Sequence, residues 1–163
     1  MLTQEYLKSI LSYDPETGIF VRKIKTTNSV KIGDIAGYIT PYGYISISIN
    51  RKRQQAHRLA WFYIYGEFPK YDIDHINGIR HDNRIENLRL ATRSENMQNL
   101  KKAKSDNKST GLLGTFLDKR DGRIYARIKI NKNLIHLGCF ETKEKAHEAY
   151  LTAKRECHEF GTL

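Results

Sequence analysis

The chain has 163 residues, which is enough for one ordinary domain or two small ones with little shared core. Its formal net charge of +10 favours a polyanionic partner, because surface lysine and arginine release condensed counterions from phosphates. No apolar run approaches the roughly 18 to 20 residues that span a bilayer, and the first residues lack a basic region followed by an apolar one, so we expect a cytoplasmic protein without a membrane partner.

The chain begins with elements typical of a small mixed region. Thr3 is a candidate N-cap for a short helix over residues 3–11, which has apolar residues on one face. The sequence DPETG at 14–18 predicts a turn, and GIFVRK after it predicts a strand. Residues 44–50 (YISISIN) alternate apolar and polar, which is typical of a half-buried strand.

A basic hairpin and a buried helix are expected next. NRKR at 50–53 predicts a hairpin tip before a strand at QQAH. RLAWFYIY at 58–65 predicts a buried helix, closed by Gly66. His57 allows two interpretations, a DNA contact or packing beneath Trp61 at the helix entry.

Residues 71–83 (YDIDHINGIRHDN) concentrate acids and imidazoles in an otherwise basic chain. Residues 71–100 hold four Lys/Arg and five Asp/Glu, whereas residues 1–70 hold ten and five and residues 101–163 hold fourteen and eight. A neutral centre between two basic flanks is where acidic groups could carry a cation while the flanks hold a nucleic acid.

The residues around this segment predict a strand, loop, strand and helix in that order. IDHI is expected to be extended, with a second short strand near LRLA. Thr92 followed by Glu95 is a capping-box pattern, so a helix should begin at Arg93 with Asn96 in its first turn. This compact ββα unit could bring Asp74, His75 and Asn96 together. His81 and Asp82 are expected to shape a turn.

Phosphodiester hydrolysis explains these residue types. Mg²⁺ prefers oxygen ligands, which Asp74 and Asn96 would supply, and Mn²⁺ is the expected substitute. An imidazole that is neutral near physiological pH can deprotonate the attacking water, and His75 is the candidate. Arg84 and Arg89 are candidate phosphate contacts, although arginines beside acidic residues often form only solvated ion pairs.

The tail predicts a separate module after a linker. KKAKSDNKST at 101–110 is the expected basic linker, between a domain at 1–100 with its core at about 71–100 and a domain at 111–163. In GRIYARIKIN, alternate residues should line a core face and a basic, aromatic face; a turn at 131–133, a strand at LIHLGCF and a helix opened by Thr142 should follow. The predicted DNA contacts of this tail are Lys119, Arg120, Arg123, Tyr125, Arg127 and Lys129.

The cysteines are expected to be small apolar residues in a reducing compartment. Cys139 is assigned to the core, and Cys157 falls on the apolar spacing of the last helix. No second cysteine pair exists to build a four-thiolate site, so structural zinc is not expected.

At this point two family resemblances emerge. DHINGIRHDNRIENLR followed by ENMQN resembles the HNH endonucleases of phages and mobile introns, and AHRLAWFYIYGEFP resembles the segment usually found just upstream. The resemblance implies that His75 is the base, that Asp74 and Asn96 hold one divalent cation, and that Asn87 fixes the loop and the histidine. Asn96 stands where many such proteins have histidine, which supports a single hard cation and argues against zinc.

The tail, from GLLGTFLDKRDGRIYARIKI through HLGCFETKEKAHEAY, resembles an AP2-type DNA-binding domain. The implied fold is α+β, with a β-rich N-terminal region, a ββα-metal core and a three-stranded sheet with one helix. The implied function is that of a monomeric homing endonuclease of a phage or bacterial cell, which nicks double-stranded DNA to leave 5′-phosphate and 3′-hydroxyl ends. A DNA-binding regulator with a structural ββα unit, and an RNA-binding module, remain alternatives.

Overall fold

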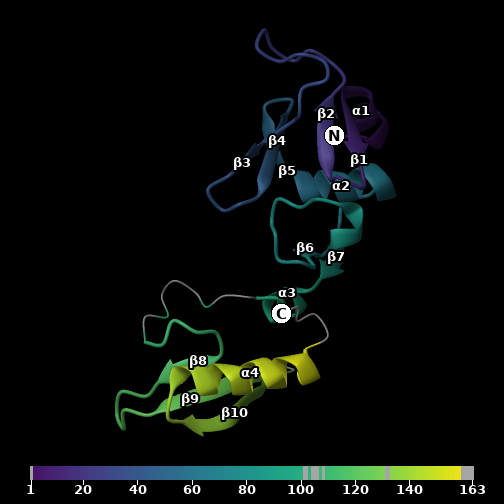
Figure 1. Cartoon of the computed structure of the whole chain (residues 1–163). Helices are drawn as coiled ribbons and strands as arrows, with labels where there is room; N and C mark the ends of the chain where they lie inside the picture. The colour runs from purple at the N-terminus through teal and green to yellow at the C-terminus, as the bar shows by residue number, and fades with distance from the viewer. Residues whose placement is uncertain (1, 101–102, 104–106, 108, 131–132, 159–163) are drawn as a thin grey trace. The chain divides into compact units, whose positions relative to one another are not determined.

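The computed structural model describes residues 2–100, 103, 107, 109–130 and 133–158. These residues contain four α-helices and several small antiparallel sheets, which agrees with the predicted mixture of helices and strands (Figure 1). Contacts divide the chain into two compact units, Met1–Asn96 and Met97–Leu163. Most of the predicted linker at 101–110, and most of the turn at 131–133, lie outside the described residues. No described helix is long and apolar enough to cross a membrane.

The first unit opens with helix α1 (Gln4–Ile10), which the Thr3 side chain caps as predicted. A hairpin of β1 (Leu11–Asp14) and β2 (Ile19–Arg22) follows. A three-stranded sheet then forms in the order β3 (Tyr38–Ile39), β4 (Ile45–Ile49) and β5 (Lys52–Gln55). Its β4 strand confirms the prediction made from the alternation at 44–50.

Helix α2 (Ala56–Tyr65) ends at Gly66, which adopts the left-handed conformation expected of a C-cap (φ 78°). The helix begins earlier than predicted, because Ala56 and His57 form its first turn. The predicted strand at QQAH is therefore wrong in part, since β5 ends at Gln55 and already includes Lys52 and Arg53.

The remaining elements of the first unit carry the candidate site. Strand β6 (Asp72–His75) pairs antiparallel with β7 (Leu88–Ala91), and the short 3₁₀ helix η1 (Ile85–Asn87) lies between them. Helix α3 (Arg93–Gln98) follows, and the first unit ends within it, at Asn96. The capping box is confirmed, because the Thr92 backbone N–H donates to Glu95 Oε2 at 2.6 Å and the Glu95 N–H donates to Thr92 Oγ1 at 3.3 Å.

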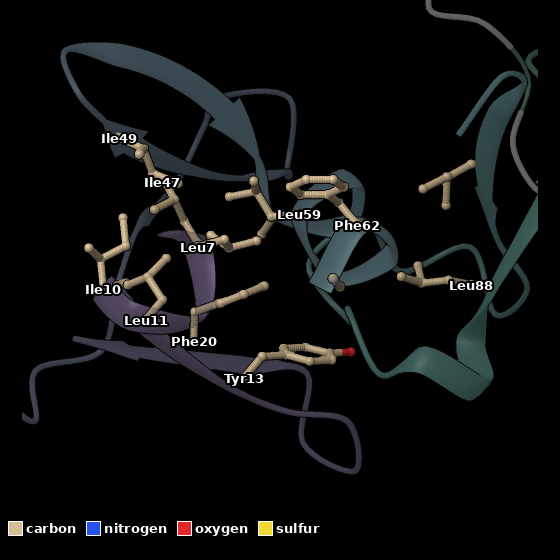
Figure 2. Packing of buried hydrophobic residues seen from close by; sticks show 14 residues of the cluster. Leu7, Ile10, Leu11, Tyr13, Phe20, Ile47, Ile49, Leu59, Phe62 and Leu88 are labelled. Carbon is tan, nitrogen blue, oxygen red and sulfur yellow. The ribbon is translucent and has the colours of Figure 1, made fainter. Parts of the chain in front are cut away.

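One hydrophobic core joins the hairpin, the second sheet and α2 to the candidate site. Leu7 of α1, Ile47 of β4 and Leu59 of α2 are fully buried within it (Figure 2). Ile73 and Leu88 extend the same cluster into the β6–β7 pair. The short β6–β7 hairpin therefore takes its support from this larger core, since an isolated two-stranded hairpin is marginal in water.

The second unit is an antiparallel sheet in the order β10–β9–β8, with one helix against it. Its bounds are β8 (Thr115–Leu117), β9 (Ile124–Ile130), β10 (Asn133–Phe140) and α4 (Lys143–Cys157). Ala126 and Ile128 are buried while Arg127 and Lys129 are exposed, which confirms the predicted two faces of β9. Thr142 caps α4 through the Lys145 N–H, also as predicted.

The prediction that the cysteines pack as core residues is wrong. Cys139 and Cys157 are free and exposed, so neither belongs to the core. The buried positions of α4 are Ala146, Tyr150 and Lys154. A lysine takes the inward place because its ammonium donates to the Leu100 carbonyl at 2.7 Å, while its long aliphatic stem packs inside.

Gly18, in the β1–β2 turn, links the fold to the candidate site. It has φ +72°, and a Cβ there would lie 2.5 Å from the backbone of both Asn83 and Arg84. Gly33 has a similar left-handed conformation (φ +93°) but nothing within 4 Å of the same position. Comparing alanine substitutions at Gly18 and Gly33 therefore distinguishes the cost of backbone strain from the cost of a steric clash.

We expect Gly33→Ala to lower the free energy of unfolding by about 1–2 kcal/mol through the left-handed conformation alone. Gly18→Ala should lose about a further 1–3 kcal/mol, because the backbone around Asn83 has to shift. Denaturant unfolding of both variants measures the difference. An equal loss of free energy of unfolding in the two variants would show that the turn does not pack closely against the Asn83 backbone.

Candidate active site

Strand β6 brings Asp74 and His75 into the interior, although both side chains are polar. Their relative exposures are 4% and 5%. Ile76 donates its N–H to the Asn87 carbonyl at 2.9 Å, so the strand is held to the loop just beyond His75. Two titratable groups thus occupy neighbouring buried positions on one short strand.

Asp74 forms a buried ion pair with Arg89, the residue opposite it on β7. The guanidinium donates from Nε at 2.9 Å and from Nη2 at 2.8 Å to the same carboxylate oxygen, Oδ2. A buried carboxylate needs such a partner, since desolvation would otherwise destabilise its charged form. Arg89, a predicted DNA contact, is therefore engaged with the predicted metal ligand.

His75 is fixed by the loop between β6 and η1. Its Nε2 lies 3.4 Å from Asn83 Oδ1, and because an amide oxygen only accepts, Nε2 donates and carries the proton. In the neutral ring Nδ1 is then the nitrogen able to take up a proton. Burial lowers the pKa of His75, opposed by the Asn83 hydrogen bond and the Asp74 charge, so the base form is favoured at neutral pH.

Asn83 is almost fully buried, at 1% exposure. Its carbonyl accepts a hydrogen bond from the Tyr13 hydroxyl of β1 at 2.7 Å, and burial raises the pKa of that hydroxyl. The Ile85 N–H donates to the Pro15 carbonyl of the β1–β2 turn at 3.1 Å. The first hairpin of the chain thereby positions the loop that orients His75.

Asn87 closes the same loop from the other side. Its Oδ1 accepts from the Asn77 N–H at 3.0 Å, and its Nδ2 donates to the Asp82 carbonyl at 2.8 Å. These contacts are what a residue that fixes the loop should make. Asn87 has no direct contact with His75 among the interactions of the described residues, and acts on it through the loop.

The other residues singled out in this segment form surface pairs. Arg84 binds Asp82 and Glu86, at 2.8 and 2.9 Å, and its hydrogen bond lowers the pKa of Asp82 to about 2. Asp82 also accepts from the Asn77 amide, so it shapes the turn, as predicted. His81 is exposed. Arg84 therefore forms the ion pairs that are the alternative to a phosphate contact.

His57 was missed as part of this site. Its ring packs edge-on against His75 with centroids 5.1 Å apart, and both rings lie against Tyr44, at 5.3 and 6.0 Å. Its Nδ1 is buried without a hydrogen-bond partner among the described residues. Burial, and then the neighbouring His75, lower the pKa of His57 to about 3. The sequence carried no signal for this contact, because eighteen positions separate the two histidines.

Asn96 lies half-buried in α3, as the capping box predicted. Its side chain makes no hydrogen bond within the described part of the chain, whereas its N–H donates to the Thr92 carbonyl at 2.9 Å. No group of three or more His, Cys, Asp or Glu that could hold a metal occurs among the described residues. Asp74 and Asn96 offer carboxylate and amide oxygens, a donor chemistry that suits a hard divalent cation.

Comparison with known proteins identifies the same region. A family model described as HNH endonuclease matches residues 54–98, from the end of β5 to the end of α3. No curated protein and no solved structure matches the chain. The match supports an HNH nuclease domain in the first unit, and with it DNA nuclease activity and a divalent metal in general terms.

The buried histidine pair predicts an acid-sensitive fold. The unfolded chain protonates His57 near pH 6.5, whereas the folded chain does so only near pH 3. The unfolded state therefore binds more protons in this window, and the free energy of unfolding should fall as the pH drops below 6.5, by up to about 1.4 kcal/mol per pH unit.

We expect His57→Leu to flatten this dependence between pH 6.5 and 4, since the variant has no ring to protonate. Denaturant unfolding at four pH values measures the slope, and His81→Leu, at an exposed histidine, is the matched control. A wild-type slope in His57→Leu would mean that His57 is solvated in the folded protein.

Proposed function

We propose that the protein is a metal-dependent DNA endonuclease that nicks one strand of duplex DNA, in the manner of a homing endonuclease. The observation that carries the proposal is the buried Asp74–His75 pair on β6, with His75 held in one tautomer by Asn83. Neutral imidazole and oriented carboxylate are the groups that phosphodiester hydrolysis requires. The HNH family match at residues 54–98 supports the same reaction.

His75 would act as the general base. Its Nδ1 would accept a proton from water as that water attacks the phosphorus in line with the departing 3′ oxygen. The products would carry 5′-phosphate and 3′-hydroxyl ends. Asn83, Asn87 and Tyr13 would keep the ring in place without touching the substrate.

Asp74 and Asn96 would hold one divalent cation, Mg²⁺ or Mn²⁺. When bound, such a cation stabilises negative charge on the phosphate and on the leaving oxygen. Arg89 now neutralises the Asp74 carboxylate, so its guanidinium would have to share that carboxylate with the cation. If the cation displaced Arg89 from Asp74, the guanidinium would be available to contact DNA, as expected from the sequence.

The second unit would bind duplex DNA through the open face of its sheet, as an AP2-like domain. The Arg127 guanidinium stacks 4.3 Å above the Phe116 ring, and Phe116 stacks on Tyr125 at 5.4 Å. Helix α4 packs on this sheet and buries Ala126 and Ile128 of its apolar face. The charges of Arg127 and Lys129 therefore remain available to phosphates.

The loop before β9 offers fewer free cations than predicted. Arg120 pairs with Asp118 at 2.7 Å, and Tyr125 donates its hydroxyl to Asp121 at 2.7 Å. Lys119 and Arg123 have no ion pair within the described part of the chain. We therefore place phosphate contacts at Lys119 and Arg123, and keep Arg120 and Tyr125 as secondary contacts. One site per chain suits a monomer. The protein would act in a phage-infected or bacterial cell.

One observation favours a second function. The Arg89–Asp74 ion pair satisfies the carboxylate without metal, which is what a structural remnant of a nuclease would show. The alternative is then a DNA-binding regulator that does not cleave. It binds DNA through the same tail, so only cleavage separates the two.

We expect wild type to nick supercoiled plasmid in Mg²⁺ or Mn²⁺ and not in chelator. His75→Ala should lower the nicking rate by about 10²–10⁴ while DNA binding is kept, because only the proton transfer is lost. His81→Ala, at the exposed histidine of the same loop, is the matched control and should cleave normally. Single-turnover nicking assays measure the rates, and cleavage by His75→Ala at the wild-type rate would remove the base from this mechanism.

Replacing Arg127 and Lys129 together with glutamine should weaken DNA binding and flatten its salt dependence. If each contacts one phosphate, the slope of log affinity against log salt should drop by about one to two. Fluorescence anisotropy with duplex DNA in chelator measures it. Lys143 and Arg155 on α4, substituted in the same way, provide the control, and an equal drop there would show that only net charge matters.

A further inference from the structure

The sheet β3–β4–β5 has two unlike faces. Ile47 and Ile49 of β4 belong to the core. The other face borders a shallow groove of about 260 Å³. Besides the apolar Ile45, its lining includes Tyr42, Tyr44 and Arg53. Hydroxyl, amide and guanidinium groups therefore share the groove with apolar surface.

One lining residue of the groove packs near the candidate base. Tyr44, one of its lining residues, has its ring 6.0 Å from that of His75. The Arg80 guanidinium lies 5.1 Å from the Tyr44 ring and donates from Nη1 to the Tyr42 carbonyl at 3.0 Å. A strand lying in the groove would consequently pass close to His75.

This part of the chain is uniformly basic. No aspartate or glutamate occurs between Asp34 and Glu67. Arg51, Lys52 and Arg53 are exposed, and none of them forms an ion pair within the described residues. Unpaired cations beside the groove complement a chain of phosphates.

Arg51 has a backbone conformation that arginine rarely adopts. Ile49 pairs with Lys52, so Asn50 and Arg51 form a two-residue turn, with φ of 49° and 64°. Two positive φ values match a type I′ turn, whose second position strongly favours glycine. An arginine there is disfavoured locally, and its charge projects from the tip next to the groove strands.

We propose that the groove and the β4–β5 tip hold the sugar–phosphate backbone of the DNA strand that is cut at His75. Arg51 and Arg53 contact successive phosphates, and Tyr42 and Tyr44 pack against the sugars between them. The inference rests on the proposed function for the identity of the strand. It assigns to the first unit a DNA surface separate from the face of the second.

The test uses Arg51→Gly and Arg53→Gln in the full chain, with Lys25→Gln as control. Lys25 is an exposed lysine of the segment after β2 and does not line the groove. Binding of duplex DNA is followed by anisotropy in chelator between 50 and 200 mM salt. Each groove variant should lose about one unit of salt slope, so its affinity relative to wild type changes about 3.5-fold over this range.

Arg51→Gly gives the sharpest outcome, because glycine suits the turn. Its melting temperature should equal or exceed that of wild type while its DNA affinity falls. Wild-type affinity and slope in both groove variants would overturn the proposal, as would the same loss in Lys25→Gln. Since these measurements need no cleavage, a wild type that never nicks would refute the nuclease and leave the groove to be judged by binding alone.

Discussion

The environment of Asn83 is the constraint on which the candidate site depends. Its carbonyl is held by Tyr13 from the first hairpin, and its side chain holds His75. Because Asn83 is almost fully buried, any shift would leave polar groups without partners, at about 1–3 kcal/mol each. The position of His75 thus depends on a residue seventy positions upstream of Asn83, and the β6–β7 hairpin needs little stability of its own.

The second constraint is electrostatic. Asp74 is buried, and its neutralisation by Arg89 resolves the problem of a charge in the interior. A divalent cation would stabilise the same carboxylate, so the two cations compete for it unless substrate phosphate binds the guanidinium. In the proposed mechanism this competition would link metal binding to DNA binding, because a phosphate that binds Arg89 would leave Asp74 to the cation.

Local patterns predicted local structure well. The capping box at Thr92, the Gly66 cap and the alternation in β4 and β9 were all confirmed, because each depends on neighbours within a few residues. The contacts of Asn83, His57 and Arg89 were not foreseen, since they join separate elements. The prediction that Cys139 lies in the core was wrong for a related reason: the apolar character of a residue does not reveal which face of β10 the helix leaves exposed. The roles of Asp74, His75 and Asn96 remain predictions.

Packing two histidines edge to edge away from water has opposite effects on chemistry and on stability. Burial lowers the pKa of both His57 and His75, so the neutral form of each ring is favoured at pH values where an exposed imidazole would begin to charge. The unfolded chain has no such restraint and gains protons first, so acid favours unfolding. The buried Nδ1 of His57, which has no hydrogen-bond partner among the described residues, also lowers the free energy of unfolding. Burial therefore favours the neutral form of His75 and at the same time makes the folded chain sensitive to acid.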